Sequence, residues 1–290
     1  MGSMVLPESR WSALGYRRQS SVMIPAEHSP AFRALFDLYN RRYLLPRAFR
    51  CINLYGSLEA GVDRQRPILY IANHSSWWDG LLLFHLWRRS GENHHYVMMD
   101  EQQLSKYRFF RKLGAYSVDK SSAGASRASL RYSEDLLLAG NRVWLFPQGD
   151  IRHLESRPLI LQSGAAHLLR RVPQAAVVPV TFYYTQGLHS KSEVSLEVGR
   201  PLMEDWSVLD RSAIMAMLQD ELQRQLDRHR DRAIQAVNHP KSVQPPDPDR
   251  VIEAVNHPKS VRPPDRELLR TGLSVNEKFD RVRRGRRPAH

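Results

Sequence analysis

The middle of the chain alternates between short apolar segments and longer amphipathic ones. Apolar runs of strand length predict strands over residues 67–73, 95–100, 115–118, 142–146, 176–184 and 192–199. Apolar residues at helical spacing predict helices over residues 77–88, 104–113, 125–138, 164–171 and 210–234. This alternation is typical of a single α/β domain with a largely parallel central sheet flanked by helices, and the hairpin-like last pair of strands makes the sheet mixed.

The segment before this domain has the pattern of an amphipathic helix. Ser29 and Pro30 are a favourable N-cap and first-turn pair. Apolar residues then follow on one face, namely Phe32, Leu35, Phe36, Tyr39 and Tyr43, and polar residues lie on the other, namely Arg33, Asp37, Asn40 and Arg41. Such a helix packs on the domain or lies in a membrane surface, and both can hold at once. We assign residues 1–50 to an N-terminal extension with this helix.

The end of the chain is a repeat of low complexity. Residues 236–250 recur with few changes as residues 254–267, and both copies are rich in Pro. Such a composition buries too little apolar surface to offset chain entropy. We therefore assign residues 51–235 to the folded domain and predict that residues 236–290 form a basic, disordered tail.

Composition and charge limit the classes of protein to which the chain can belong. The chain has 290 residues, of which 42% are hydrophobic, so a sizeable core can form. Its one cysteine, Cys51, excludes an intramolecular disulfide, and no clustered Cys/His spacing predicts a metal site. The net charge of +13 lies mostly in the flanks, which suits an anionic membrane surface. No recognised nucleic-acid motif accompanies the charge, so we expect no nucleic-acid partner.

Hydropathy gives an expectation for location. No stretch approaches the ~18–20 apolar residues that a membrane span needs, and the N-terminus has no apolar core of signal-peptide type. We therefore expect a cytoplasmic protein that is peripheral on the inner face of a membrane.

The first candidate for chemistry is the segment YIANHSSWWDG, residues 70–80, in which a predicted strand ends in Asn-His. His74 and Asp79 would not share a helix face, because five residues turn through roughly 140°. They meet only if His74 lies in the turn after the strand and Asp79 in the first turn of the helix. An Asp that accepts a hydrogen bond from one ring nitrogen raises the basicity of the other, so such a histidine can take a proton from a hydroxyl.

Other strand ends carry charged residues and turns. Pro147 and Gly149 form a turn that exposes backbone amides, and Arg152 after it offers a fork suited to phosphate or carboxylate. Lys120 follows another strand and adds a point charge at the same edge of the sheet. Pro179 within a buried strand predicts an edge strand or a bulge near the site.

Four blocks in this order resemble the glycerolipid (lysophospholipid) acyltransferases. The segment 73–79 matches that family's N-H-x4-D motif, and residues 114–120, 146–152 and 177–180 resemble its three later blocks. The resemblance covers about residues 50–205. It implies O-acyl transfer from a thioester to a lipid hydroxyl, most simply 1-acylglycerol-3-phosphate to phosphatidate, in phospholipid biosynthesis.

The resemblance also implies roles for residues. Asp79 would orient His74, His74 would be the general base, and transfer would be direct, without a covalent intermediate. Arg152 and Lys120 would hold an anionic headgroup, and backbone amides near Gly149 or in the HSSWWD turn would bind the oxyanion. The partners implied are an acyl thioester of coenzyme A or of acyl-carrier protein, a lysolipid or other lipid alcohol, and an anionic membrane surface. The donor is a co-substrate, so no cofactor and no metal is implied.

Two departures from the family pattern bear on the acceptor. Gln148 stands where the family has glutamate, and Asp150 stands where it has threonine. The glutamine keeps hydrogen bonding without charge, and Asp150 adds an anion beside Arg152. An alternative is therefore an acyltransferase for a non-phosphate acceptor, such as a glycolipid or a glycosylated isoprenoid. A non-catalytic lipid-binding protein is a further alternative, which the retained His74 and Asp79 disfavour.

Overall fold

The computed structural model describes residues 23–58, 61–63, 65–89, 94–121, 123–187, 189–238 and 264–272. Its centre is a mixed sheet with the strand order β4-β3-β5-β2-β6-β7-β1-β8. The strands are β1 (Phe49–Tyr55), β2 (Ile68–Ala72), β3 (His95–Asp100), β4 (Ala115–Val118), β5 (Arg142–Leu145), β6 (Ala176–Thr185), β7 (Ser192–Val198) and β8 (Arg266–Arg270). Strands β4, β3, β5, β2 and β6 are parallel, and β7 is antiparallel to β6. The predicted fold class is confirmed.

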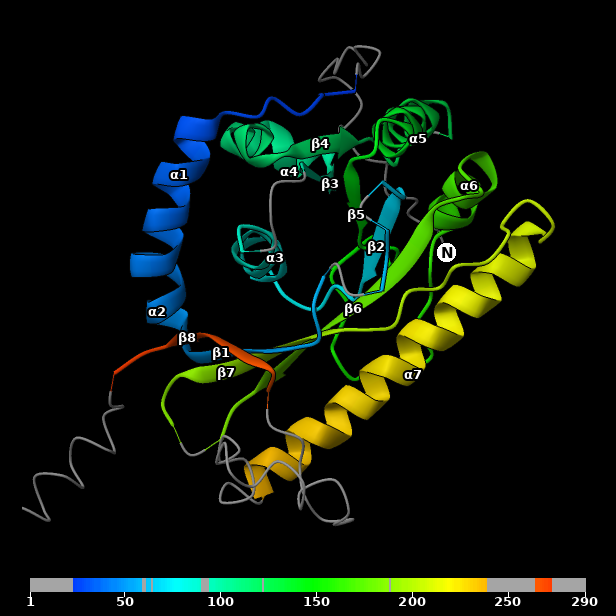
Figure 1. The fold of residues 1–290 in the computed structure, drawn as a ribbon. Coiled ribbons are helices and arrows are strands. Elements are labelled where there is room, and N and C mark those ends of the chain that lie inside the picture. Colours follow the sequence, from blue (N-terminus) through cyan, green and yellow to red (C-terminus); the bar gives the residue numbers. More distant parts are fainter. Residues whose placement is uncertain are drawn as a thin grey trace, which may run out of the picture.

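Helices cover both faces of this sheet (Figure 1). They are α1 (Pro30–Tyr39), α2 (Leu45–Ala48), α3 (Asp79–Trp87), α4 (Glu101–Lys106), α5 (Ala123–Leu138), α6 (Gly164–Arg171) and α7 (Arg211–Asn238). A π-helical turn (Asn40–Leu44) joins α1 to α2, and a 3₁₀ helix (Arg108–Leu113) follows α4. Within the described residues, no helix has the length and hydropathy needed to cross a membrane.

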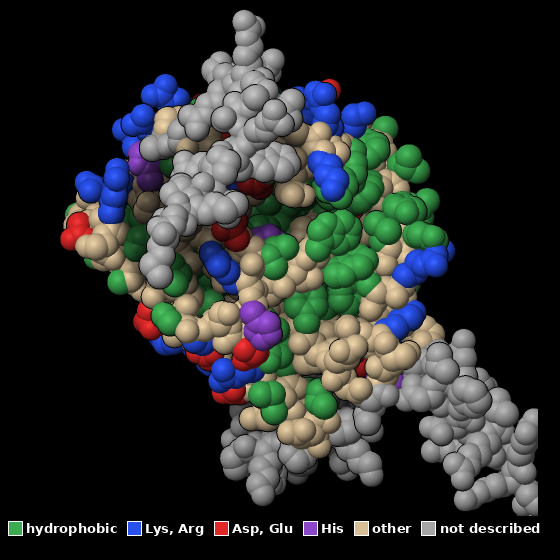
Figure 2. Space-filling view, turned by 180° about the vertical axis from the view of Figure 1, so that it is seen from behind, with side chains coloured by type: hydrophobic (Ala, Val, Ile, Leu, Met, Phe, Trp, Pro, Cys, Tyr) green, Lys and Arg blue, Asp and Glu red, His purple; other side chains and the backbone are tan. Residues whose placement is uncertain are grey.

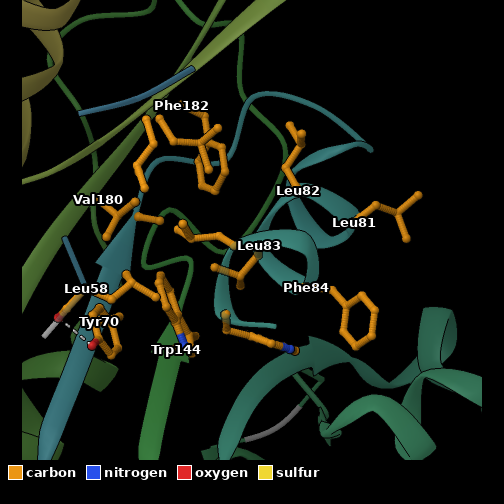
Figure 3. Close-up of a cluster of buried hydrophobic side chains, with 14 of the residues drawn as sticks. Leu58, Tyr70, Leu81, Leu82, Leu83, Phe84, Trp144, Val180 and Phe182 are labelled. Atoms are coloured by element: carbon orange, nitrogen blue, oxygen red, sulfur yellow. Dashed lines mark hydrogen bonds between the residues drawn. The ribbon is translucent and has the colours of Figure 1, made fainter. Parts of the chain in front are cut away.

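The core divides into two clusters because alternate residues of β2 point to opposite faces of the sheet. Tyr70 and Ala72 join the cluster beneath α3 and α1, whereas Leu69 and Ile71 join the cluster beneath α5, α6 and α7. Figure 3 shows the first cluster, in which side chains of α3 approach Tyr70 and Trp144. The rings of Tyr70 and Trp144 stack with centroids 4.0 Å apart, and the Tyr70 hydroxyl donates to the Leu58 carbonyl. Burial on both faces makes β2 a rigid support for the residues that follow it.

The predicted position of Pro179 at an edge or a bulge is wrong. Strand β6 lies inside the sheet between β2 and β7, and Pro179 is in register with Ile71. The β6–β7 ladder stops at Val180 and Val198, and beyond it the Gly199 amide donates to the Pro179 carbonyl. The proline thus stands where the chain of β7 leaves the sheet, so that its missing amide costs no ladder hydrogen bond.

The predicted disordered tail is wrong for its described part. Residues 266–270 form β8, which is antiparallel to β1, and Leu268 and Leu269 pack on the first core cluster. Strand β1 was not predicted, although it pairs with β7 on one side and β8 on the other. Backbone pairing with an otherwise open edge explains why a segment with so little apolar surface joins the sheet. The rest of the predicted tail beyond α7 lies outside the described residues.

Helix α1 begins as predicted, since the Ser29 hydroxyl accepts from the Phe32 amide. Its apolar residues, however, do not share one buried face. Phe36 packs on Phe84 with ring centroids 5.5 Å apart, while Leu35 is 64% exposed. Asn40, expected on the polar side, is fully buried and donates to the Leu81 carbonyl. The helix is therefore packed on the domain and also presents apolar side chains to solvent.

The single helix predicted for residues 104–113 is two shorter elements. Asp100 at the end of β3 accepts from the amides of Gln102 and Gln103 and so starts α4 at once. Tyr107 then leaves the helical conformation, with φ −116° and ψ 58°, before the 3₁₀ helix begins. The remaining helices lie within a few residues of their predicted bounds.

Candidate active site

His74 lies in the turn after β2, and Asp79 is the first residue of α3. The His74 Nδ1 and the Asp79 Oδ2 are 2.8 Å apart. A carboxylate only accepts, so Nδ1 carries the proton, and in the neutral ring the lone pair is on Nε2. The Asp79 side chain is fully buried, whereas that of His74 is 23% exposed. The imidazole is thus held on one side and open to a reacting group on the other.

The Asp79 carboxylate is held by three further donors. The amides of Ser75 and Ser76 donate to Oδ2 at 2.8 and 2.9 Å, so the turn closes on the carboxylate. The hydroxyl of Tyr184, near the end of β6, donates to Oδ1. Burial, followed by the Asp79 charge, raises the pKa of Tyr184 well above its usual value, so this hydroxyl keeps its proton. Four hydrogen bonds offset the cost of burying the charge.

Two side-chain amides fix the turn that carries His74. Asn73 exchanges two hydrogen bonds with the backbone of Phe182, which clamps the end of β2 to β6. Gln148 is buried, and its Oε1 accepts from the His74 amide at 2.7 Å. The Phe146 ring stacks on the imidazole with centroids 4.4 Å apart. Backbone, amide and ring contacts together leave the imidazole one orientation.

The segment after β5 forms the opposite wall of the site. Pro147 occupies the second position of a tight turn in which the Gly149 amide donates to the Phe146 carbonyl at 3.0 Å. Gly149 has φ +80°, a conformation that favours glycine. The Arg152 amide donates to the His74 carbonyl, so the two turns are joined by a backbone hydrogen bond.

The predicted cations are paired with carboxylates. Lys120 Nζ lies 2.7 Å from Asp150 Oδ1, 3.4 Å from Asp100 and 2.7 Å from the Gly149 carbonyl. Arg152 extends into solvent, with its Nη2 3.7 Å from Asp150. The Lys120 ammonium holds the pKa of the Asp150 carboxyl below its usual range. Two cations thus face two carboxylates, and this corner of the site is close to neutral.

His74 lines a pocket of about 880 Å³. The side chains of α3, β3 and the 3₁₀ helix give it an apolar wall, which includes Leu81, Phe84, Trp87, Val97, Phe110 and Leu113. Lys120, Pro147, Gly149 and Asp150 also line it. An oriented imidazole beside a deep apolar pocket suits proton abstraction from a hydroxyl next to a long aliphatic group.

The structure brings the predicted residues to one edge of the sheet. His74, Asp79, Lys120, Pro147, Gln148, Gly149 and Arg152 all follow the carboxyl ends of parallel strands, where sites in such sheets form. The amides of Ser75, Ser76 and Gly149, however, already donate within the protein, so an oxyanion has to find other donors. Tyr184 and Asp100 were missed because only the fold brings them here.

The chain is similar to known proteins in sequence and in fold. Residues 54–183 match the family model described as Acyltransferase. A crystal structure of the 1-acyl-sn-glycerophosphate acyltransferase PlsC from Thermotoga maritima is similar, with a TM-score of 0.50 and 16% sequence identity. The match covers 68% of this chain and 79% of that one, and at this identity it shows a shared fold. No curated protein sequence matches the chain.

Proposed function

We propose that this enzyme of the acyltransferase family, in which residues 54–183 match the family model, transfers a fatty acyl group from a thioester to a lipid hydroxyl. One observation carries the mechanism: the buried Asp79 orients His74 at the wall of the large apolar pocket. Acyl transfer to a lipid fits this pocket, because burial of the aliphatic chain supplies binding energy.

In the proposed mechanism, His74 Nε2 removes the proton from the acceptor hydroxyl while Nδ1 stays bound to Asp79. The oxygen attacks the thioester carbonyl, the carbon–sulfur bond breaks, and the departing thiolate takes the proton from the imidazolium. Asp79 stabilises the imidazolium and remains ionised. No nucleophile of the protein is needed. Cys51 is buried in β1 away from this pocket, and burial raises the pKa of its thiol to about 12. Ser75 and Ser76 hydroxyls accept hydrogen bonds within the turn.

The simplest acceptor is 1-acylglycerol-3-phosphate. The similar PlsC is described as acting on that substrate. In this chain Lys120 lines the pocket, and Arg152 lies next to the pocket residue Asp150. A phosphate there would have to compete with Asp150 for both cations.

The pairing of Lys120 with Asp100 and Asp150 favours a second candidate acceptor. A corner that is close to neutral suits a hydroxyl-bearing headgroup without phosphate, such as a glycolipid or a glycosylated isoprenoid. Carboxylates also accept hydrogen bonds from sugar hydroxyls.

Thiol release from palmitoyl-coenzyme A tests the function, with lysophosphatidic acid, other lysophospholipids and a glycosylated lipid as acceptors. His74→Ala is expected to lower turnover at least ~100-fold through loss of general-base catalysis. His153→Ala is the matched control, because His153 is exposed and outside the pocket lining. Turnover that survives His74→Ala would refute the mechanism.

Asp150→Asn separates the two acceptors. If the acceptor carries phosphate, the loss of the competing carboxylate frees Lys120 and Arg152, and kcat/KM for lysophosphatidic acid should rise about tenfold. If the acceptor is an uncharged sugar lipid, lysophosphatidic acid stays a poor substrate in both proteins and the glycosylated lipid is the one consumed.

We also propose that the molecule works on a membrane surface. Leu35, Leu38, Tyr39 and Tyr43 are each at least 46% exposed on α1 and the turn after it, and Arg41 and Arg42 lie beside them. Figure 2 shows hydrophobic side chains on the right-hand side of the molecule, which is the side of α1, with Lys and Arg side chains at their border. Apolar residues rimmed by cations fit the interface of an anionic bilayer, from which a lipid acceptor would enter.

A further inference from the structure

Besides Lys120, a second group of basic side chains lines the active-site pocket. Arg127 comes from α5, His167 from α6, and Arg211 is the first residue of α7. Arg211 Nη2 lies 3.4 Å from His167 Nδ1, so the beginnings of α6 and α7 meet here through their side chains. Arg127 precedes the pocket residue Leu130 by one helical turn and therefore lies on the same side of α5.

These arginines differ from Lys120 in their charge balance. Over the described ranges, neither Arg127 nor Arg211 forms an ion pair. Asp210, the residue before Arg211, and Glu134, two helical turns beyond Arg127 on α5, have other partners. Asp210 accepts from the Ala213 amide and the Ser212 hydroxyl, and Glu134 pairs with Arg171. Lys120 is thus balanced by carboxylates, whereas the guanidinium groups of Arg127 and Arg211 lack a carboxylate partner among the described residues.

The reaction proposed above limits what can bind beside these two arginines. The thioester carbonyl has to sit at His74, and the fatty chain needs the apolar wall that includes Leu81, Phe84 and Trp87. The thiol side of the donor must then leave by a polar part of the same pocket. Both common acyl thioesters, those of coenzyme A and of acyl-carrier protein, continue from the sulfur into a pantetheine arm that ends in a phosphate ester. Arginine is the side chain best suited to bind phosphate.

We propose that Arg127 and Arg211, together with His167, bind the phosphate ester of the donor's pantetheine arm. The inference rests on the proposed function and names the donor side of the same pocket. Burial, then the Arg211 charge, lowers the pKa of His167, so this imidazole contributes a hydrogen bond while the two arginines contribute the charge. The site would hold the donor by a group that both kinds of acyl thioester share.

Binding of non-reactive thioethers tests the site without turnover. The probes are S-hexadecyl-coenzyme A, S-hexadecyl-4′-phosphopantetheine and S-hexadecyl-pantetheine, titrated by calorimetry into the full chain. Arg127→Gln and Arg211→Gln are each expected to weaken the two phosphate-bearing probes about tenfold and to leave the pantetheine probe unchanged. Arg131→Gln is the matched control, because Arg131 is exposed one turn further along α5 and outside the pocket lining.

The outcomes separate the sources of phosphate. Equal losses for the coenzyme A and phosphopantetheine probes support the proposal, whereas a loss confined to coenzyme A assigns the arginines to its nucleotide and overturns it. Losses for lysophosphatidic acid with no change for the thioethers assign them to the acceptor and also overturn it. Equal losses for all three thioethers indicate a structural effect and overturn it. Failure of the proposed function would instead appear as absent acyl transfer, which these affinities do not depend on.

Discussion

The reactivity of His74 depends on how the negative charge of Asp79 is shared among its neighbours. The Asp79 Oδ2 accepts hydrogen bonds from His74 and from two backbone amides, and its Oδ1 accepts from the Tyr184 hydroxyl. Every donor other than His74 draws charge away from the imidazole and makes it less basic. Tyr184 is therefore a positioning residue that also tunes the base.

Tyr184→Phe is expected to lower kcat about 10- to 100-fold, because a hydrogen bond to a buried charged group is lost. It should also move the acidic limb of the kcat/KM profile to higher pH. Without the Tyr184 donor, Asp79 holds the imidazolium form of His74 more strongly, so the base is protonated up to a higher pH. The measurement is the pH dependence of kcat/KM with saturating acceptor.

The neighbouring tyrosine is a matched control for that experiment. The Tyr183 hydroxyl donates to Glu155 at 2.8 Å, and its ring belongs to the second core cluster. Tyr183→Phe should leave the pH profile unchanged. If Tyr184→Phe lowers thermal stability but leaves the profile in place, the residue has only a structural role.

At this scale, the sequence could predict contacts within one turn but not contacts across the sheet. His74 and Asp79 are five residues apart, and a strand-to-helix turn brings them together whatever the rest of the fold does. The contacts of Gln148 with His74 and of Tyr184 with Asp79 need the parallel register of β5, β2 and β6. The charge of Asp150 was visible in the sequence, whereas its ion pair with Lys120 could be predicted only from the relative positions of two strand ends.

Among the elements, α1 separates a packing face from an exposed one. From the sequence alone, Phe32 and Phe36 would be the residues to change in a membrane-binding test. In the structure they face the 3₁₀ helix and α3, so their substitution would disrupt packing. The exposed pair Leu35 and Leu38 is the appropriate target.

Leu35→Glu with Leu38→Glu should weaken binding to anionic vesicles at least tenfold, because both apolar contacts are replaced by repulsive charges. Co-sedimentation with vesicles that contain phosphatidylserine measures this. Val208→Glu serves as the control, since Val208 is 76% exposed on a loop before α7. Equal binding by all three proteins would mean that α1 is not the membrane contact.

Strand β8 is an element whose sequence gave no signal. It begins at the end of a Pro-rich repeat, and the open edge of β1, which exists only once the sheet has formed, is what orders it. Pro179 is the reverse case, because a reliable sequence rule was overridden by the place where β7 leaves the sheet. Strands with their own apolar pattern, such as β2 and β6, were predictable. Strands defined by their partners were not.

Two truncations test the contribution of β8. Removal of residues 273–290 should leave the melting temperature unchanged, since β8 is retained. Removal of residues 264–290 should lower it by several degrees, because the pairing with β1 and the packing of Leu268 and Leu269 are worth about 2–3 kcal/mol. Equal melting temperatures would show that β8 adds nothing to stability.

At the scale of the whole molecule, both core clusters and the sheet enclose uncharged histidines. Burial lowers the pKa of His85, His95 and His229 to about 3 in each case. His95 Nδ1 accepts from the Trp144 indole, and both ring nitrogens of His229 lie within 2.8 Å of hydroxyls, on Thr181 and Ser195. These contacts hold the neutral rings of His95 and His229. Burial disfavours the charged form of all three histidines, so their protonation destabilises the folded state.

The molecule should therefore lose stability as the pH falls below the ordinary histidine pKa of about 6.5. In that range these histidines bind protons in the unfolded state but not in the folded state, so the free energy of unfolding decreases with decreasing pH. At pH 5 each of the three histidines lowers it by about 2 kcal/mol relative to pH 7. Urea unfolding at the two pH values measures the sum. His229→Gln should reduce the slope, while His153→Gln, at an exposed site, should not. A free energy of unfolding that is the same at pH 7 and pH 5 would mean that the buried rings accept protons in the folded state.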